Sequence, residues 1–177
     1  MKNIITIGGS SSKNSINKQF AEYAASLVDG IKEINIDLND YEMPIFSIDR
    51  ENENGFPEKA KQLSDLFDTA DGFIISLAEH NGAYSAAFKN VFDWLSRING
   101  KVWRNKPMIL LSTSPGARGG QSVLQIALNR FPFGGANIID SMSLPSFFDN
   151  FSNGLVTDIQ LSDNLTGIMK NYENILK

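Results

Sequence analysis

The stretch Gly8-Gly9-Ser10-Ser11-Ser12-Lys13-Asn14-Ser15-Ile16-Asn17 decides the fold of this chain. The apolar, β-branched run at residues 4–7 precedes it and predicts a buried strand. After it, apolar residues recur at helical spacing and predict a helix with one apolar face: Ile16, Phe20, Ala24, Leu27 and Val28. A strand that turns through glycines into a helix start is suited to binding an anion. The first helical N–H groups have no intrahelical partner, and the helix dipole is positive there.

The spacing of this stretch excludes two familiar phosphate-binding loops. A P-loop needs G-x-x-x-x-G-K-[ST], but counting from Gly9 places Asn14 and Ser15 where Gly and Lys belong. The dinucleotide pattern G-x-G-x-x-G also fails, because Ser10 and Lys13 stand at its second and third glycines. Two interpretations remain open. The hydroxyl and amide side chains form a neutral phosphate site, or the stretch is a serine-rich turn that only caps the helix.

The composition is that of an ordinary globular protein, and we expect residues 1–177 to form one domain. No run approaches the ~18 apolar residues of a membrane span, and the first strand begins too early to leave room for a signal peptide. The absence of cysteine excludes disulfides and thiolate catalysis. These features fit a cytoplasmic protein without a membrane partner. A net charge of -4 without a basic cluster argues against a nucleic-acid partner.

Strands and helices alternate along the rest of the chain. The expected strands cover residues 31–38, 72–77, 107–112 and 136–144, and the expected helices follow Pro57, Ser85 and Gly120 and cover residues 161–175. Residues 39–56 are polar and turn-rich without a helical period, which predicts a long loop. The alternation predicts an α/β fold: a flavodoxin-like three-layer sandwich with a five-stranded parallel sheet of order 2-1-3-4-5.

Three loops rich in Gly, Ser and Asn follow the first, third and fourth strands, at residues 8–17, 78–85 and 112–120. Ligands of such sheets bind at the carboxyl ends of the strands, beside the first and third strands. Because the three loops share this composition and follow strands that end at one edge of the sheet, they predict a ligand site at that edge.

The second loop reads Ala78-Glu79-His80-Asn81-Gly82-Ala83-Tyr84-Ser85 and leads into Phe88-Lys89-Asn90-Val91-Phe92-Asp93-Trp94-Leu95-Ser96-Arg97. The third reads Ser112-Thr113-Ser114-Pro115-Gly116-Ala117-Arg118-Gly119-Gly120. With the first loop, they resemble the NAD(P)H-dependent FMN reductase family, which includes quinone, chromate and azo-dye reductases. Its members carry G-S-x-R-x-x-S-x-N, P-E-Y-N-G…L-K-N-A-[IL]-D-W-x-S-R and S-x-S-P-G-x-x-G-G. The resemblance covers nearly the whole chain. It implies an enzyme that binds FMN and passes electrons from NAD(P)H to a small acceptor: flavin, quinone, azo compound or metal oxyanion.

The resemblance also implies which residues hold the cofactor. Ser10, Ser15 and Asn17 would bind the FMN phosphate, residues 79–82 would line the isoalloxazine ring largely through backbone groups, and Gly116, Gly119 and Gly120 would approach the flavin. The full expected set is Ser10, Ser12, Ser15, Ile16, Asn17, Ala78, Glu79, His80, Asn81, Gly82, Ser112, Ser114, Gly116, Gly119 and Gly120. No catalytic side chain is expected, because the flavin carries the redox chemistry. No metal site is expected either, because no cluster has metal-ligand spacing.

Three positions depart from the family pattern: Ser12 stands where arginine is common, Ala78 replaces proline, and His80 replaces tyrosine. The missing arginine leaves the choice between NADPH and NADH open, and Lys13 and Arg118 are the candidates for holding a nicotinamide phosphate. For His80, the only histidine, a plain loop residue is favoured over a proton donor. Glu79 and Arg97 are expected to form an ion pair between subunits.

A set of apolar residues near the middle of the chain exceeds what one helix needs to cover a sheet: Phe88, Phe92, Trp94, Ile98, Val102 and Trp103. We expect two-fold packing of this helix to bury them in a homodimer, which pairs further in a homotetramer.

Two other classes of protein stay open. One is a flavodoxin-like electron carrier without a nicotinamide site, and the other is a binding module that keeps the fold without flavin. The chain lacks the T-x-T-G-x-[TA] loop of flavodoxins.

Overall fold

Five parallel strands form the central sheet of the computed structural model, which describes residues 1–177. The strands are β1 (Lys2–Gly8), β2 (Ile31–Ile36), β3 (Gly72–Leu77), β6 (Pro107–Thr113) and β7 (Asn137–Leu144), and their order is β2-β1-β3-β6-β7. Every pair of neighbouring strands is parallel. Counting only these five, the order is 2-1-3-4-5, which confirms the predicted fold. The carboxyl ends of β1 and β3 lie side by side, with Gly8 opposite Ser76.

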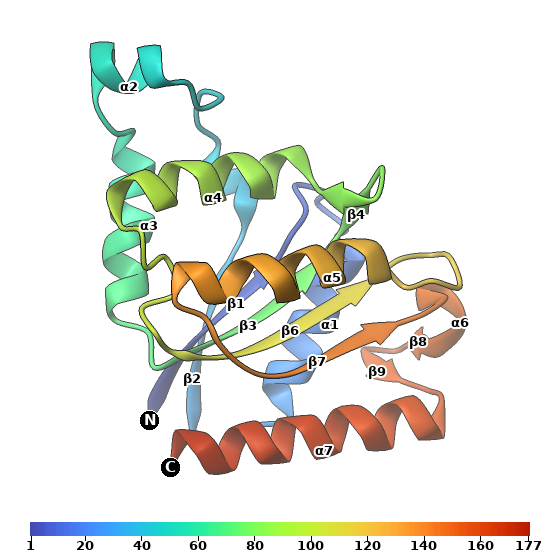
Figure 1. The fold of residues 1–177 in the computed structure, drawn as a ribbon. Helices are drawn as coiled ribbons and strands as arrows, with labels where there is room; N and C mark the ends of the chain where they lie inside the picture. The colour runs from blue at the N-terminus through green and yellow to red at the C-terminus, as the bar shows by residue number, and fades with distance from the viewer.

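Helices cover both faces of the sheet (Figure 1). One face packs against α1 (Ile16–Ser26) and α7 (Ile159–Leu176), and the other against α3 (Glu58–Asp68), α4 (Ala86–Ile98) and α5 (Gln121–Arg130). The central strands are apolar on both sides because helices bury both of their faces, and every residue of β3 is buried. No helix of the structure is both long and apolar enough to cross a membrane.

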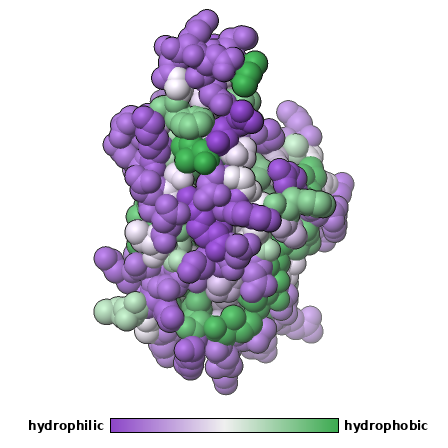
Figure 2. Space-filling view, turned by 60° about the vertical axis from the view of Figure 1, so that its left-hand side comes forward, coloured by the Kyte–Doolittle hydropathy of each residue, from purple (hydrophilic) through white to green (hydrophobic).

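The connection between β2 and α3 differs from the predicted loop. It contains a 3-10 turn, η1 (Leu38–Tyr41), and a short helix, α2 (Ile48–Asn54), that projects from the body of the molecule (Figure 1). The Ser47 hydroxyl caps α2 by accepting from the Arg50 N–H at 3.2 Å, and Gly55, at φ 70°, ends it. No residue of α2 is buried, so the helix has no apolar periodicity for sequence reasoning to detect. Figure 2 shows this projecting end as mainly hydrophilic.

The aromatic residues expected at a subunit interface lie inside the protomer instead. Phe88, Phe92, Trp94, Val102 and Trp103 are all buried, and Ile98 packs against the same core. The ring of Trp103 lies 4.6 Å from that of Phe131 and 5.7 Å from that of Phe92, measured between centroids. The expectation that these residues form a dimer contact is therefore wrong, because the space between α4, α5 and the sheet already uses them.

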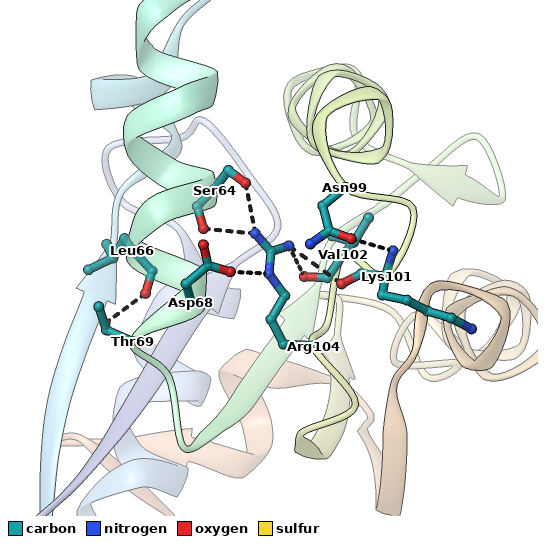
Figure 3. A network of polar contacts seen from close by, with 8 residues as sticks. All are labelled: Ser64, Leu66, Asp68, Thr69, Asn99, Lys101, Val102 and Arg104. Atoms are coloured by element: carbon teal, nitrogen blue, oxygen red, sulfur yellow. Dashed lines mark hydrogen bonds and ion pairs between the residues drawn. The ribbon is translucent and has the colours of Figure 1, made fainter.

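Arg104 fastens the segment before β6 to α3 (Figure 3). Its Nε donates to the Asp68 carboxylate at 2.6 Å, and its Nη2 donates to the backbone oxygen and hydroxyl of Ser64 at 2.9 and 2.7 Å. The side chain of Arg104 is only 8% exposed, so this contact is a packed anchor rather than a solvated surface pair.

Candidate cofactor site

A cavity of about 230 Å³ lies at the carboxyl ends of β1, β3 and β6. Residues from all three predicted loops line it, together with one residue of α6 (Phe147–Asn150): Ser10, Ser12, Asn14, Ser15, Ile16, Asn17, Ala78, Glu79, His80, Thr113, Ser114, Pro115 and Phe148. The structure thus brings together most of the expected cofactor-binding residues. Three larger cavities, of about 440, 310 and 300 Å³, lie elsewhere and share none of these residues.

The first loop presents neutral hydrogen-bonding groups to this cavity. The Ser15 hydroxyl caps α1 by accepting from the Lys18 N–H at 3.1 Å, and the Ser10 hydroxyl accepts from the Ser12 N–H at 3.1 Å. Each hydroxyl keeps its own proton to donate. The N–H groups of Ile16 and Asn17 lie in the first turn of α1, where no intrahelical acceptor exists. Glycine is required at position 8, because a Cβ there would lie 2.5 Å from the backbone nitrogen of Lys18. The absence of a Cβ lets the loop run close to α1.

No lysine or arginine lines the cavity. Lys18, on the first turn of α1, donates to the Asp37 carboxylate at 3.0 Å, and that hydrogen bond raises the pKa of Lys18. Lys13 is exposed and outside the lining, and the guanidinium of Arg118 donates to the Ser122 hydroxyl at 3.0 Å. An anion in this cavity would therefore be held by neutral donors and by the dipole of α1.

The side chain of Asn17 does not serve the role expected from the sequence. Its Nδ2 donates to the Thr113 carbonyl oxygen, and its Oδ1 accepts from the Thr113 N–H and the Ser76 hydroxyl. Asn17 is 2% exposed, so this amide joins α1 to the ends of β3 and β6 rather than facing a ligand. What Asn17 offers to the cavity is its backbone N–H.

The second loop is a small hairpin of β4 (Glu79–His80) and β5 (Ala83–Tyr84). Its turn residues Asn81 and Gly82 have φ values of 52° and 78°, the left-handed region that an Asn-Gly pair adopts readily in a two-residue hairpin turn. Two side chains fix the hairpin. The Ser85 hydroxyl donates to the Gly9 carbonyl at 2.7 Å, and the Glu79 carboxylate accepts from the Val123 N–H at 3.1 Å.

The expected ion pair between Glu79 and Arg97 is absent within the protomer. Arg97 instead donates to both carboxylate oxygens of Glu51, at 2.8 and 3.1 Å, and so holds the projecting α2 against α4. The hydrogen bond from Arg97 lowers the pKa of the Glu51 carboxyl. Arg97 pairs with Glu51 because α2 brings that carboxylate next to it. The sequence did not predict α2, so it did not indicate this partner.

The third loop is shaped by Ser112 and by glycines with positive φ. Ser112 is fully buried and its hydroxyl donates to the Gly119 carbonyl at 2.8 Å, so its side chain does not reach the cavity as expected. Gly119 and Gly120 have φ values of 56° and 76°, and a Cβ on Gly119 would collide with Leu144 and Ser143. Ser114 lines the cavity, whereas Asn81, Gly82, Gly116, Gly119 and Gly120 lie outside its lining.

Four lining residues lie outside the expected set: Asn14, Thr113, Pro115 and Phe148. Asn14 belongs to the first loop and Thr113 and Pro115 to the third, and their place in those loops was the available signal. Phe148 follows β7, the last strand of the central sheet, and lies outside all three loops, so no pattern in the sequence points to it.

The donor set fits the phosphate and polyol parts of FMN. It consists of hydroxyls, amide groups and free backbone N–H groups, and the one carboxylate, Glu79, is occupied by the Val123 N–H. The hairpin beside the cavity offers backbone groups to a flat ring, which the cavity itself is too small to enclose.

A parallel sheet of this order, covered by helices on both faces, defines a flavodoxin-like fold. Residues 2–149 match the family model for NADPH-dependent FMN reductase, and the chain belongs to that family. It is 30% identical to a quinone reductase of Escherichia coli (strain K12) over 117 residues, 66% of this chain and 62% of that protein. The chain therefore spans about three fifths of the length of that relative.

Two further proteins show how far the likeness extends. The chain is 33% identical to the uncharacterized protein MG342 homolog of Mycoplasma pneumoniae over 155 residues, which cover 84% of this chain and 91% of that protein. FerB, a flavoenzyme NAD(P)H:(acceptor) oxidoreductase from Paracoccus denitrificans, has a similar structure with a TM-score of 0.80 and 24% identity. That likeness covers 99% of this chain and 97% of FerB, and it supports the fold.

Proposed function

We propose that this chain is an oxidoreductase that binds FMN and transfers electrons from NAD(P)H to a small acceptor, with a quinone as the first candidate. The observation that carries this proposal is the single cavity into which three separate loops bring neutral donors at the switch point of the sheet. Membership of the NADPH-dependent FMN reductase family and the likeness to a quinone reductase support it.

When bound, FMN supplies the hydride-transfer chemistry, so the protein needs no nucleophile or acid–base pair of its own. In this proposal the phosphate is held by the hydroxyls of Ser10, Ser12 and Ser15 and by the N–H groups of Ile16 and Asn17. Residues 78–82 face the flavin ring through their backbone, and Ser114 and Gly116 bound it from the third loop. Ser112, Gly119 and Gly120 act by shaping that loop.

Rigid positioning of these groups is the main contribution of the protein. The Asn17 amide ties the first loop to the third, the Ser85 hydroxyl ties the second to the first, and the Glu79 carboxylate ties the second to α5. Donors that are already in place lose less conformational entropy when a ligand binds. The three ties therefore favour tight cofactor binding without a cation in the lining.

NAD(P)H and the acceptor are proposed to use the open side of the hairpin in turn, with Lys13 and Arg118 as candidates for binding the nicotinamide phosphate.

We further propose a cytoplasmic homodimer or tetramer. With the aromatic residues of α4 buried, the exposed apolar residues available beside α2 are Ile45 and Ile48, which are 74% and 51% exposed. Light scattering tests this: a dimer gives twice 19.6 kDa, and a fully active monomer contradicts it.

Steady-state kinetics with NADPH and a soluble quinone test the proposed function. The protein is supplied with FMN, and the concentrations of both substrates are varied. Two substrates that use one site in turn give parallel double-reciprocal lines. Ser15→Ala is the matched variant: with FMN held near its wild-type dissociation constant it loses rate because less cofactor is bound. Turnover that is absent in wild type, or independent of FMN, contradicts the proposal.

A further inference from the structure

Phe148 is an aromatic side chain that lines the cavity and yet remains 70% exposed. It lies on α6, in the segment that follows β7. Single exposed apolar side chains are common on protein surfaces, but this ring stands at the edge of a polar cavity. The rest of the lining is mostly hydroxyl, amide and backbone groups, so Phe148 differs in kind from its neighbours.

The segment that carries Phe148 is held in place by the third loop. The Ser146 N–H donates to the Gly116 carbonyl at 2.9 Å, and the Phe147 N–H donates to the Ser114 carbonyl at 3.0 Å. The Asn150 side chain closes the segment by donating to the Pro145 carbonyl at 2.9 Å. The backbone under Phe148 is therefore fixed relative to the cavity.

Packing shows which end of the cavity Phe148 flanks. Its neighbour Phe147 is buried and stacks on Phe151 at 4.6 Å, and Phe151 contacts Tyr23 of α1 at 5.7 Å between centroids. Ile16, in the first turn of α1, packs against the same apolar cluster. The hairpin belongs to the cluster on the opposite face of the sheet, where Tyr84 packs on Phe131. Through Phe147, whose ring centroid lies 5.5 Å from its own, Phe148 adjoins the apolar cluster on the α1 side of the sheet, where Ser15, Ile16 and Asn17 begin the helix.

These donors are neutral, which makes the exclusion of water important. Ser12 occupies the position where the family pattern has arginine, and no lysine or arginine lines the cavity. Hydroxyls and a helix dipole hold an anion strongly only where the local dielectric constant is low. An apolar ring beside the donors lowers it by displacing solvent.

We propose that Phe148 is a positioning residue that covers the phosphate end of the cavity and compensates for the missing arginine by excluding water from the phosphate. This rests on the proposed function, because it takes FMN as the ligand. It adds a residue outside the three loops to the machinery that holds the cofactor. It also predicts a signature that depends on the phosphate, because the proposed function places the flavin ring against the hairpin, away from Phe148.

The test compares the dissociation constants of FMN and riboflavin, measured by fluorescence quenching of the flavin on titration with protein. We expect Phe148→Ala to weaken FMN binding about tenfold, or about 1.4 kcal/mol, and to change riboflavin binding by less than about twofold. Phe148→Leu, which keeps an apolar cover, should recover most of the loss. The control is Phe133→Ala, because Phe133 is equally exposed, at 76%, and lines no site described here. It should leave both constants unchanged.

Three results overturn the proposal: an unchanged FMN constant in Phe148→Ala, an equal loss for FMN and riboflavin, and a loss that Phe148→Leu does not recover. Thermal unfolding of each variant shows whether a loss reflects the fold, and an exposed position should leave the melting temperature unchanged. Failure of the proposed function looks different, because wild-type protein would then bind neither flavin.

Discussion

The side-chain amide of Asn17 is bonded twice to the backbone of Thr113. Its Nδ2 donates to the Thr113 carbonyl oxygen at 3.1 Å, and its Oδ1 accepts from the Thr113 N–H at 3.1 Å. The same Oδ1 accepts from the Ser76 hydroxyl at 2.7 Å. One buried side chain thus joins the start of α1 to the ends of β3 and β6, directly beneath the cavity.

Asn17→Ala should therefore act on the fold as well as on the ligand. It removes the partners of buried backbone and hydroxyl groups, and we expect a loss of about 2–4 kcal/mol in the free energy of unfolding. Riboflavin binding should fall together with FMN binding, because the loops lose their alignment. Urea unfolding and flavin titration measure the two effects. A variant of unchanged stability that loses only FMN affinity would show that the amide faces the phosphate after all.

Glu79 is predicted to hold the hairpin through α5. Gly120 precedes this helix and provides no side-chain cap, so the Glu79 carboxylate serves instead by accepting from the Val123 N–H. Glu79→Ala should lower the free energy of unfolding by about 1 kcal/mol and weaken riboflavin binding, since the proposed function places the hairpin against the ring. Glu79→Gln keeps an acceptor and should retain most of both. Equal losses in the two variants would mean that the negative charge, rather than the acceptor, is required.

Two tyrosines whose hydroxyl groups are buried offer a matched pair for stability. The Tyr84 hydroxyl is buried without a hydrogen-bond partner, whereas the Tyr172 hydroxyl donates to the Phe73 carbonyl at 3.2 Å. Tyr84→Phe should therefore leave the free energy of unfolding unchanged or raise it by up to about 1 kcal/mol. Tyr172→Phe should lower it by about 1 kcal/mol. Denaturant unfolding measures the sign of the change in the free energy of unfolding for each variant. A destabilised Tyr84→Phe would reveal a partner for that hydroxyl, such as an ordered water.

The same pair predicts how stability changes in alkali. Burial raises the pKa of Tyr84 to about 12 and raises that of Tyr172 as well. The unfolded chain ionises its phenols at about pH 10, so ionisation favours the unfolded state above that pH. The stability of the protein should fall as the pH rises from about 10 to 12, and Tyr84→Phe should reduce the fall. A pH-independent free energy of unfolding in this range would contradict the buried state of these hydroxyls.

The nicotinamide preference should be weak. Ser12 replaces the usual arginine, and Arg118 is the one remaining guanidinium in the three loops, hydrogen-bonded to Ser122 across one turn. We expect kcat/KM for NADPH and NADH to differ by less than about 100-fold, or about 2.7 kcal/mol. Steady-state kinetics with both donors measure the ratio. A larger preference for NADPH would mean that a cation recognises the 2′-phosphate, and Arg118→Ala should then abolish it.

The sheet order and the meeting of three loops could be predicted because both follow from short-range patterns. Buried strands are recognisable as apolar runs. Helix starts are recognisable at Ser15 and Ser85, whose hydroxyls cap α1 and α4, and at Gly120, which precedes α5. The helix α2 could not be predicted in this way, because it is exposed all round and is fixed by Arg97 from a distant part of the chain.

Roles of individual side chains were harder to predict than their location. Asn17 and Ser112 lie where expected, but tertiary hydrogen bonds turn them inward. Phe92 and Trp103 were read as surplus apolar surface because the sequence does not show that Phe131 shares their cluster. Phe148 reaches the site from beyond the last strand, through contacts that no local pattern encodes.

The most direct measurement of the central claim is an anaerobic mixing experiment. Protein loaded with FMN and freed of excess cofactor by desalting is mixed with one equivalent of NADPH or NADH, and the visible absorbance of the flavin is followed. The account predicts a flavin spectrum that survives desalting, bleaches with either donor, and returns when a quinone is added. Protein that emerges colourless, or a bound flavin that neither donor bleaches, would contradict it.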